Sequence, residues 1–215
     1  MNKIKACLFD LDGVVVDTAK YHYLAWNRLA NSLGFNFTEK DNERLKGVSR
    51  MRSLEILLSV GNVNPSEKEK LKMAKEKNDW YVEYISKLDE SEILPGVKEF
   101  LIELRQNGIK IALGSASKNS MIILNNLNLT SYFDAIIDGN KVSKAKPDPE
   151  VFLLGARELN VQPSECVVFE DAQAGIDAAK AANMKVIGIG QKDVLVNVDK
   201  IFEGLSNAHM DIIEF

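Results

Sequence analysis

Cysteine is scarce in this sequence of 215 residues, which contains only Cys7 and Cys166. Both lie inside short apolar runs typical of strands, so buried reduced thiols are a better interpretation than a disulfide or a cysteine-based metal site. This usage favours a reducing compartment, and we expect a cytoplasmic protein.

Long apolar runs and an excess of basic charge are also missing. No stretch is apolar over the length that a membrane helix needs, and residues 1–5 lead into a short strand-like run, unlike a secretory signal. The formal net charge of -4 lacks the basic excess of a nucleic-acid binder. We therefore expect a mature, soluble protein without membrane or nucleic-acid partners, in which an anionic substrate needs a local positive pocket.

Internal repeats and low-complexity tracts are absent as well, so the order of apolar segments is the main guide to architecture. Short apolar runs suited to the buried strands of a parallel sheet occupy residues 4–9, 109–113, 135–137, 166–169 and 185–189. The later runs each follow a helix-like stretch or a turn, which is the alternation of βαβ units. The sequence predicts a doubly wound, Rossmann-like α/β core with a parallel sheet.

One segment near the N-terminus interrupts this alternation, because strand signals disappear from it. Three stretches in it carry apolar residues at helical spacing with polar faces between them: residues 21–33, 50–59 and 66–86. We therefore predict a core domain of residues 1–16 and 93–215 and an inserted all-helical cap domain of residues 17–92. The tail after residue 190 shows no motif.

The strongest signal for chemistry is the run Asp-Leu-Asp-Gly-Val-Val-Val-Asp-Thr at residues 10–18, directly after the first strand. Asp10 and Asp12 can converge on one cation, because the chain turns at Gly13, where a side chain would obstruct the backbone. An Asp-x-Asp pair alone fits an ordinary polar turn equally well. The complete string after a buried strand is far more specific.

Three later segments follow predicted strands in a similar way. Ser115 precedes amides that open a helix, which suits phosphate binding, although a serine that only caps the helix is the simpler alternative. Lys146 precedes Pro147, and a lone lysine there is usually just solvated. Glu170 and Asp171 end a buried strand, where two acids are costly unless they bind a cation or are well paired. Asp171 also suits a helix N-cap, and both roles can coexist.

In this order the four segments resemble the four motifs of the haloacid dehalogenase superfamily. The resemblance implies that Asp10 attacks phosphorus and becomes an aspartyl phosphate, while Asp12 serves as general acid and base. It assigns Ser115 to phosphate binding and Lys146 to screening the negative charge around the nucleophile.

The same resemblance implies one Mg²⁺ ion, because a cation must offset the repulsion between the carboxylate nucleophile and the phosphate. Its ligands would be Asp10, the backbone carbonyl of Asp12, Asp171 and, less directly, Glu170. Phosphate oxygen and water would complete an octahedral oxygen shell.

The helical insertion resembles the cap of the β-phosphoglucomutase branch of this superfamily, in which the cap selects the substrate. The implied sugar- and phosphate-binding residues of the insertion are Thr18, His22, Trp26, Lys46, Gly47, Arg50, Ser53 and Lys77. Arg50 offers a planar fork to phosphate oxygens, and Gly47 allows close approach. Ordinary polar residues at a helix start are the alternative for Lys46 and Arg50, which flank this glycine. His22 and Trp26, taken alone, also suit a structural histidine and a core aromatic.

The core contributes the run Ser-Ala-Ser-Lys-Asn, which β-phosphoglucomutases also carry. After Ser115 it supplies Ala116, Ser117, Lys118 and Asn119 to the implied substrate site. A mutase that works through a bisphosphate must hold a second, distal phosphate, whereas a phosphatase needs one phosphate site. The sequence departs from the usual mutase pattern at Gly114, often alanine there, and at Ala172, where serine or threonine is usual.

The resemblance thus implies a monomeric enzyme that interconverts β-D-glucose 1-phosphate and β-D-glucose 6-phosphate. An aspartyl phosphate and β-D-glucose 1,6-bisphosphate, which also acts as activator, would be its intermediates. A phosphatase acting on a hexose phosphate is the first alternative, because it uses the same four motifs. A non-catalytic binding protein is the second, although it would require a damaged site, and all four motifs are intact.

Overall fold

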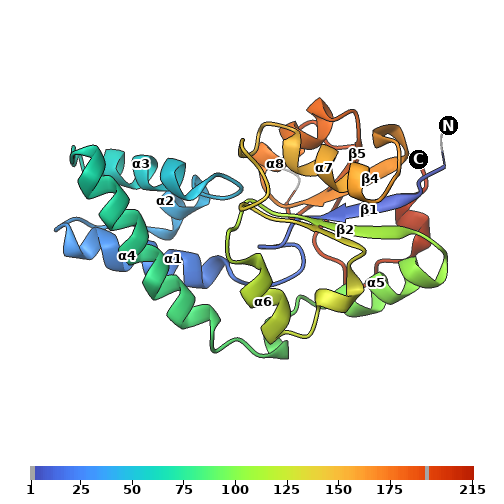
Figure 1. Cartoon of the computed structure of the whole chain (residues 1–215), viewed down its shortest axis with the longest axis horizontal. Coiled ribbons are helices and arrows are strands. Elements are labelled where there is room, and N and C mark those ends of the chain that lie inside the picture. The colour runs from blue at the N-terminus through green and yellow to red at the C-terminus, as the bar shows by residue number, and fades with distance from the viewer. Residues whose placement is uncertain (1–2, 192–193) are drawn as a thin grey trace.

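The computed structural model describes residues 3–191 and 194–215 and consists of two lobes (Figure 1). The larger lobe contains a sheet of six parallel strands in the order β3-β2-β1-β4-β5-β6. The strands are β1 (Ala6–Phe9), β2 (Lys110–Gly114), β3 (Ala135–Ile137), β4 (Cys166–Glu170), β5 (Lys185–Ile189) and β6 (Lys200–Phe202). The predicted doubly wound α/β core is confirmed.

Helices cover both faces of this sheet. Successive residues of a strand point to opposite faces, and here the residues on both faces are apolar. In β1, Cys7 and Phe9 join one apolar cluster, whereas Ala6 and Leu8 join the other. Helices α5 (Val97–Gln106) and α6 (Ser120–Asn126) pack on the first cluster. Helices α7 (Glu150–Glu158) and α8 (Gln173–Ala181) pack on the second. Both faces of the central strands are therefore buried, as their continuous apolar sequences require.

The smaller lobe is entirely helical in the part of the chain from Ala19 to Ile85. It consists of α1 (Ala19–Ser32), α2 (Glu39–Glu43), α3 (Arg50–Val60) and α4 (Glu67–Ile85). Side-chain oxygens cap three of these helices at their first turns, from Thr38, Ser49 and Ser66. The lobe has an apolar cluster of its own around Phe37, Leu54 and Leu57. The domain boundaries at residues 17 and 92 stay a prediction.

Helix α4 links the two lobes, since its ends belong to different apolar clusters. Ala74 packs in the cluster of the helical lobe, whereas Tyr81 and Ile85 are buried in the cluster of the sheet. The side-chain amide of Asn126 donates a hydrogen bond to the carbonyl of Ile85 at 3.0 Å. The C-terminal turn of α4 is thus anchored in the α/β lobe.

Strand β6 was not expected from the sequence, because the tail after residue 190 shows no strand signal. It is three residues long, lies at the edge of the sheet and is only partly buried. Both cysteines are free and buried, as predicted. Among the helices of the described residues, none combines the length and the apolar character that crossing a membrane requires.

Candidate active site

The predicted catalytic residues gather at the carboxyl edge of the sheet, next to its central strand. Asp10 directly follows β1, Ser115 follows β2, and Glu170 and Asp171 stand at the end of β4. Since β1 lies between β2 and β4, the parallel strands deliver these residues to one place. This is the point where strand order reverses, which is the usual binding crevice of open α/β sheets.

Lys146 reaches this edge from the loop between β3 and α7 and is almost fully buried. Its Nζ donates to Asp10 Oδ1 at 2.5 Å and to Glu170 Oε2 at 2.8 Å. Burial alone would lower the pKa of Lys146, but the two carboxylates raise that pKa above its ordinary value. Lys146 is therefore a permanent positive charge beside the expected nucleophile.

Three carboxylates surround this single lysine. Asp10, Glu170 and Asp171 offer oxygen atoms that all lie within 4.8 Å of one another. Burial first, and then the charge of Asp10, raise the pKa values of Glu170 and Asp171. A Cβ atom at Gly13 would lie 2.3 Å from Asp171 Oδ2, so glycine is needed for this approach. The buried, unbalanced, all-oxygen cluster fits a divalent cation such as Mg²⁺.

The alternative roles considered for Asp171 and Ser115 as helix caps are wrong. Ala172 is the N-cap of α8, and Asn119 is the N-cap of α6. Ser115 Oγ accepts a hydrogen bond from Ser117 N at 3.1 Å within a loop that precedes α6. The helix begins only at Ser120, so residues 115–119 form a polar loop at the carboxyl edge of the sheet.

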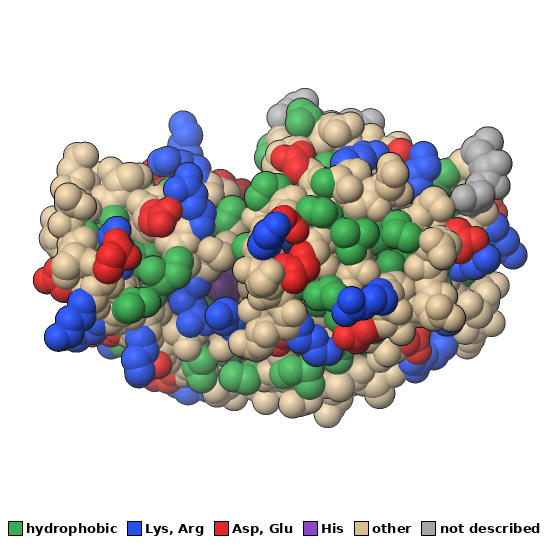
Figure 2. Space-filling view, turned by 45° about the horizontal axis from the view of Figure 1, so that its top comes forward, with side chains coloured by type: hydrophobic (Ala, Val, Ile, Leu, Met, Phe, Trp, Pro, Cys, Tyr) green, Lys and Arg blue, Asp and Glu red, His purple; other side chains and the backbone are tan. Residues whose placement is uncertain are grey.

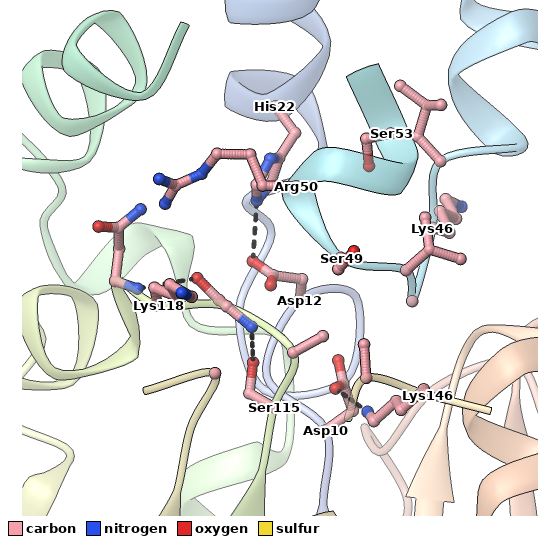
Figure 3. Close-up of a pocket in the computed structure, with 18 of the residues that line it drawn as sticks. Asp10, Asp12, His22, Lys46, Ser49, Arg50, Ser53, Ser115, Lys118 and Lys146 are labelled. Carbon is pink, nitrogen blue, oxygen red and sulfur yellow. Dashed lines mark hydrogen bonds and ion pairs between the residues drawn. The ribbon is translucent and has the colours of Figure 1, made fainter. Parts of the chain in front are cut away.

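Asp12 lies outside the three-carboxylate cluster and turns toward the helical lobe (Figure 3). Thr18 Oγ1 donates to Asp12 Oδ1, and His22 Nε2 lies 3.9 Å from the same oxygen. Burial, with a further contribution from Asp10, raises the pKa of Asp12 to about 6, and the Thr18 hydrogen bond limits the rise. A carboxyl group with this pKa can both give and take a proton near neutral pH.

His22 of α1 packs against Lys77 and Tyr81 of α4. Its ring stacks on Tyr81 with centroids 4.0 Å apart, and its Nδ1 lies 3.0 Å from Lys77 Nζ. Burial, with the charges of Lys77 and Arg50, lowers the pKa of His22 well below its ordinary value. A neutral His22 that accepts from Lys77 at Nδ1 carries its proton on Nε2, the nitrogen facing Asp12.

Lys77 is buried beside His22, with only 2% of its surface exposed. Its Nζ lies 4.5 Å from the ring centroid of Trp26 and 4.6 Å from that of Tyr81. Burial first, and then the charge of Arg50, lower the pKa of Lys77 well below its ordinary value. The spacing of α4 alone suggests an ordinary solvated lysine on an amphipathic helix. Lys77 is instead buried and lies against two aromatic rings.

The two lobes enclose a cavity of about 330 Å³. All the site residues expected from the sequence line it, except Thr18 and Glu170, which are fully buried behind its wall. Arg50 and Lys118 reach into it on the side away from Lys146 (Figure 3). Lysine and arginine side chains also stand at the border between the lobes on the molecular surface (Figure 2). The cavity thus presents positive charge at two separate positions.

Several lining residues were not expected as site residues, among them Ser49, Asn78, Tyr81, Ser143 and Lys144. Tyr81 follows Lys77 by one helical turn, so the spacing of α4 places both on one face. Lys144 was expected to be a surface charge. Its side chain is 71% exposed and lies 3.4 Å from Asp148, and it also borders the cavity.

The loop carrying Lys46 and Gly47 approaches the sheet closely, which explains one departure from the mutase pattern. Gly47 has a positive φ of 72°, and a Cβ atom there would lie 2.8 Å from Cβ of Ala172. A small residue at each position permits this contact. Lys46 Nζ lies 2.9 Å from Glu43 and 4.0 Å from Asp171. At the other departure, a Cβ atom on Gly114 would lie 2.8 Å from the ring of Phe152.

The family model described as haloacid dehalogenase-like hydrolase matches residues 7–189, and the chain belongs to this family. Within it, the chain is 41% identical to β-phosphoglucomutase from Bacillus subtilis strain 168, over 98% of this chain and 94% of the relative. The crystal structure of β-phosphoglucomutase from Clostridium difficile superimposes with a TM-score of 0.93 at 45% identity, covering 98% of this chain and 95% of that one. A phosphorylated carbohydrates phosphatase from Thermotoga maritima is 35% identical over 86% of this chain and 84% of its own length.

Replacing Lys146 with methionine tests the charge balance of the cluster. In the presence of a chelator at about pH 7.5, we expect the free energy of unfolding to fall by about 3 kcal/mol, because buried carboxylates lose their counter-charge. The loss should shrink near pH 5, where Glu170 and Asp171, with their raised pKa values, take up protons. Urea denaturation measures both values. Lys144→Met, at an exposed neighbour, should change stability by less than about 0.5 kcal/mol, and an equal loss there would contradict the explanation.

Replacing Asp12 with asparagine tests the raised pKa of this carboxyl group. The folded protein holds the Asp12 proton up to about pH 6, whereas the unfolded chain releases it near pH 3.8. Ionised Asp12 therefore costs stability increasingly as the pH rises through this window. We expect metal-free Asp12→Asn to be more stable than wild type by about 2 kcal/mol at neutral pH and equally stable near pH 4. Thermal melts across this range measure the difference, and Asp17→Asn, at an exposed position, should show none.

Proposed function

We propose that this protein is a phosphomutase that interconverts β-D-glucose 1-phosphate and β-D-glucose 6-phosphate. The observation that carries the proposal is the distribution of cations around one cavity: Lys146 beside Asp10, and Arg50 with Lys118 away from it. A substrate with two phosphates requires such a pair of positions. The similarity over nearly the full chain to β-phosphoglucomutases of two bacteria supports the same assignment.

In this proposal Asp10 is the nucleophile. Its Oδ1 is held by Lys146, which leaves the other carboxylate oxygen to form the bond to phosphorus. The phosphorus–oxygen bond to the sugar breaks, and the sugar oxygen receives the proton of Asp12. In the reverse step, ionised Asp12 removes the proton from a sugar hydroxyl, which attacks the aspartyl phosphate.

Thr18 and His22 control Asp12 in this scheme. Thr18 donates to one carboxylate oxygen of Asp12, and the Nε2 proton of neutral His22 faces the same oxygen. Burial and the charge of Asp10 favour the protonated form of Asp12, whereas the Thr18 hydrogen bond and the charges of Lys146 and Lys77 favour the ionised form. The pKa of Asp12 is thereby raised only to about 6, where the two forms needed in successive steps are close in free energy.

The cofactor in this proposal is one Mg²⁺ ion, held by Asp10, Asp171, Glu170 and the backbone carbonyl of Asp12. When bound, it offsets the repulsion between the Asp10 carboxylate and the phosphate. Lys146 contributes permanent positive charge at the same place, and Ser115 binds a phosphate oxygen there.

The distal phosphate is assigned to Arg50 of the helical lobe and to Ser117, Lys118 and Asn119 of the other lobe. These residues come from both sides of the cavity. In the proposed cycle, β-D-glucose 1,6-bisphosphate reorients so that its two phosphates exchange sites. His22, Trp26, Lys46, Gly47, Ser53, Lys77 and Ala116 then surround the sugar and the two phosphates.

The cap formed by residues 17–92 keeps water from the aspartyl phosphate in this proposal. We further infer that the protein works as a monomer in the cytoplasm, a location supported by its two buried free thiols. A phosphatase acting on hexose phosphates is the alternative, since the Thermotoga maritima phosphatase is 35% identical to this chain. The two functions differ in whether water or a sugar hydroxyl receives the phosphoryl group.

The mutase assignment predicts a strict outcome in one assay. With β-D-glucose 1-phosphate, Mg²⁺ and a trace of the 1,6-bisphosphate, we expect glucose 6-phosphate to form in large excess over free phosphate, and the α-anomer not to react. Asp10→Asn should reduce turnover by at least about 10³-fold, because the covalent step is lost. Release of inorganic phosphate as the main product would identify a phosphatase, and equal rates for both anomers would reject the mutase assignment.

Metal dependence is a separate prediction. Chelation should abolish turnover and addition of Mg²⁺ should restore it, because the carboxylate cluster needs a second cation besides Lys146. Asp171→Asn should raise the Mg²⁺ concentration for half-maximal activity at least about tenfold. Mg²⁺ titrations of wild type and Asp171→Asn measure the shift. Glu43→Gln is the matched control, because Glu43 pairs with Lys46 and lies outside the carboxylate cluster, and it should show no such shift.

A further inference from the structure

The loop of residues 115–119 carries the proposed distal phosphate-binding residues 117–119 but has no helix or strand of its own. Phosphate binding there requires the side chains and amides of these three residues to hold fixed directions. The neighbouring loop of residues 138–140, which follows β3, lies against it. Neither the four sequence motifs nor the proposed chemistry gives this second loop a role.

Backbone pairing continues from the strands into the two loops. Ser115 N donates to the carbonyl of Ile137 at 2.9 Å, and Gly139 N donates to the carbonyl of Ser117 at 3.0 Å. The side-chain amide of Asn140 then donates to the carbonyl of Lys118 at 2.9 Å. Three contacts in succession thus hold the phosphate loop along its length.

Asn140 is itself fixed by a buried carboxylate. Asp138 is 5% exposed, and its Oδ1 accepts from Asn140 N while its Oδ2 accepts from Asn140 Nδ2, both at 3.0 Å. The amide nitrogen of Asn140 has two hydrogens, so one is used by Asp138 and the other by Lys118. The direction of the bond to Lys118 is therefore determined by Asp138.

Gly139 permits the close packing of the two loops. A Cβ atom there would lie 2.5 Å from the carbonyl oxygen of Ala116 and 3.0 Å from Cγ of Lys118. Any larger residue would push the phosphate loop away. Residue 139 thus packs against the backbone of Ala116 and the side chain of Lys118.

We propose that Asn140, oriented by Asp138, is a positioning residue for the distal phosphate site, acting through the carbonyl of Lys118. This inference rests on the proposed function, because it assumes that residues 117–119 bind the phosphate that is not being transferred. The side-chain amide of Asn140 contacts Asp138 and the carbonyl of Lys118, toward the end of the loop away from Ser115, so we expect its effect at the distal site rather than at Asp10.

The test compares two substrates in Asn140→Ala, a phosphoryl donor to Asp10 and a phosphoryl acceptor from the phosphorylated enzyme. Acetyl phosphate carries one phosphate and needs only the site at Asp10, whereas β-D-glucose 1-phosphate reacting with the phosphorylated enzyme needs both sites. We expect KM for β-D-glucose 1-phosphate to rise about fivefold with kcat changed by less than about twofold. Hydrolysis of acetyl phosphate should keep its kcat/KM within about twofold of wild type.

Gly139→Ala is the second variant and should show the same split, because it displaces the same loop from the same side. Lys141→Ala is the matched control, since Lys141 lies on the same loop and pairs with Glu158 on the surface at 3.6 Å. It should match wild type with both substrates. Equal losses with both substrates in Asn140→Ala would indicate a general structural role and overturn the inference, as would an unchanged KM for β-D-glucose 1-phosphate.

Lys118→Ala separates failure of this inference from failure of the proposed function. If Lys118→Ala raises KM for β-D-glucose 1-phosphate and Asn140→Ala does not, the distal site stands and the positioning role is rejected. If Lys118→Ala leaves that KM unchanged, the distal site is misassigned and the positioning role falls with it. Failure of wild type to form glucose 6-phosphate rejects the mutase function itself.

Discussion

The burial of three carboxylates around one lysine is the constraint on which the rest of the structure depends. Asp10, Glu170 and Asp171 meet within 4.8 Å, Lys146 contacts the first two, and Lys46 lies 4.0 Å from the third. Such a cluster is costly for folding, because desolvated like charges repel one another. The cluster lies at the edge of the sheet where a bound cation and phosphate would offset this repulsion, so the charges that destabilise the fold also favour binding of the cation.

The parallel sheet makes this concentration of charge possible. Because β1 is central, residues following β1, β2 and β4 reach the same edge without long excursions of the chain. The apolar faces of these strands, with Phe9 stacked on Phe169 at 4.5 Å, make a rigid base beneath the charges. The helical lobe contributes different groups to the opposite side of the cavity. These are the neutral His22, the buried Lys77 and the guanidinium group of Arg50.

The sequence predicts the strand that ends just before Asp10, because a strand buried on both faces forms a continuous apolar run in the sequence. Strand β6 could not be predicted this way, since its three residues at a sheet edge are only partly buried and carry no such pattern. The same contrast holds in the site. Motif order identifies Lys146, but the role of Asn140 depends on a contact with residue 118, twenty-two positions away, which no local pattern encodes.

Helix α4 has the mechanical properties of a lever with a fixed end. Its last turn is embedded in the α/β lobe through Tyr81, Ile85 and the bond from Asn126, whereas its first turn lies in the helical lobe, about 27 Å away along the axis. Lys77 stands about 12 Å from the embedded end. A small rotation about that end would displace Lys77 by less than half as much as the first turn of α4, because displacement grows with distance from the axis of rotation. Lys77 and Tyr81, the two α4 residues that contact His22, would therefore move less than the first turn of the helix.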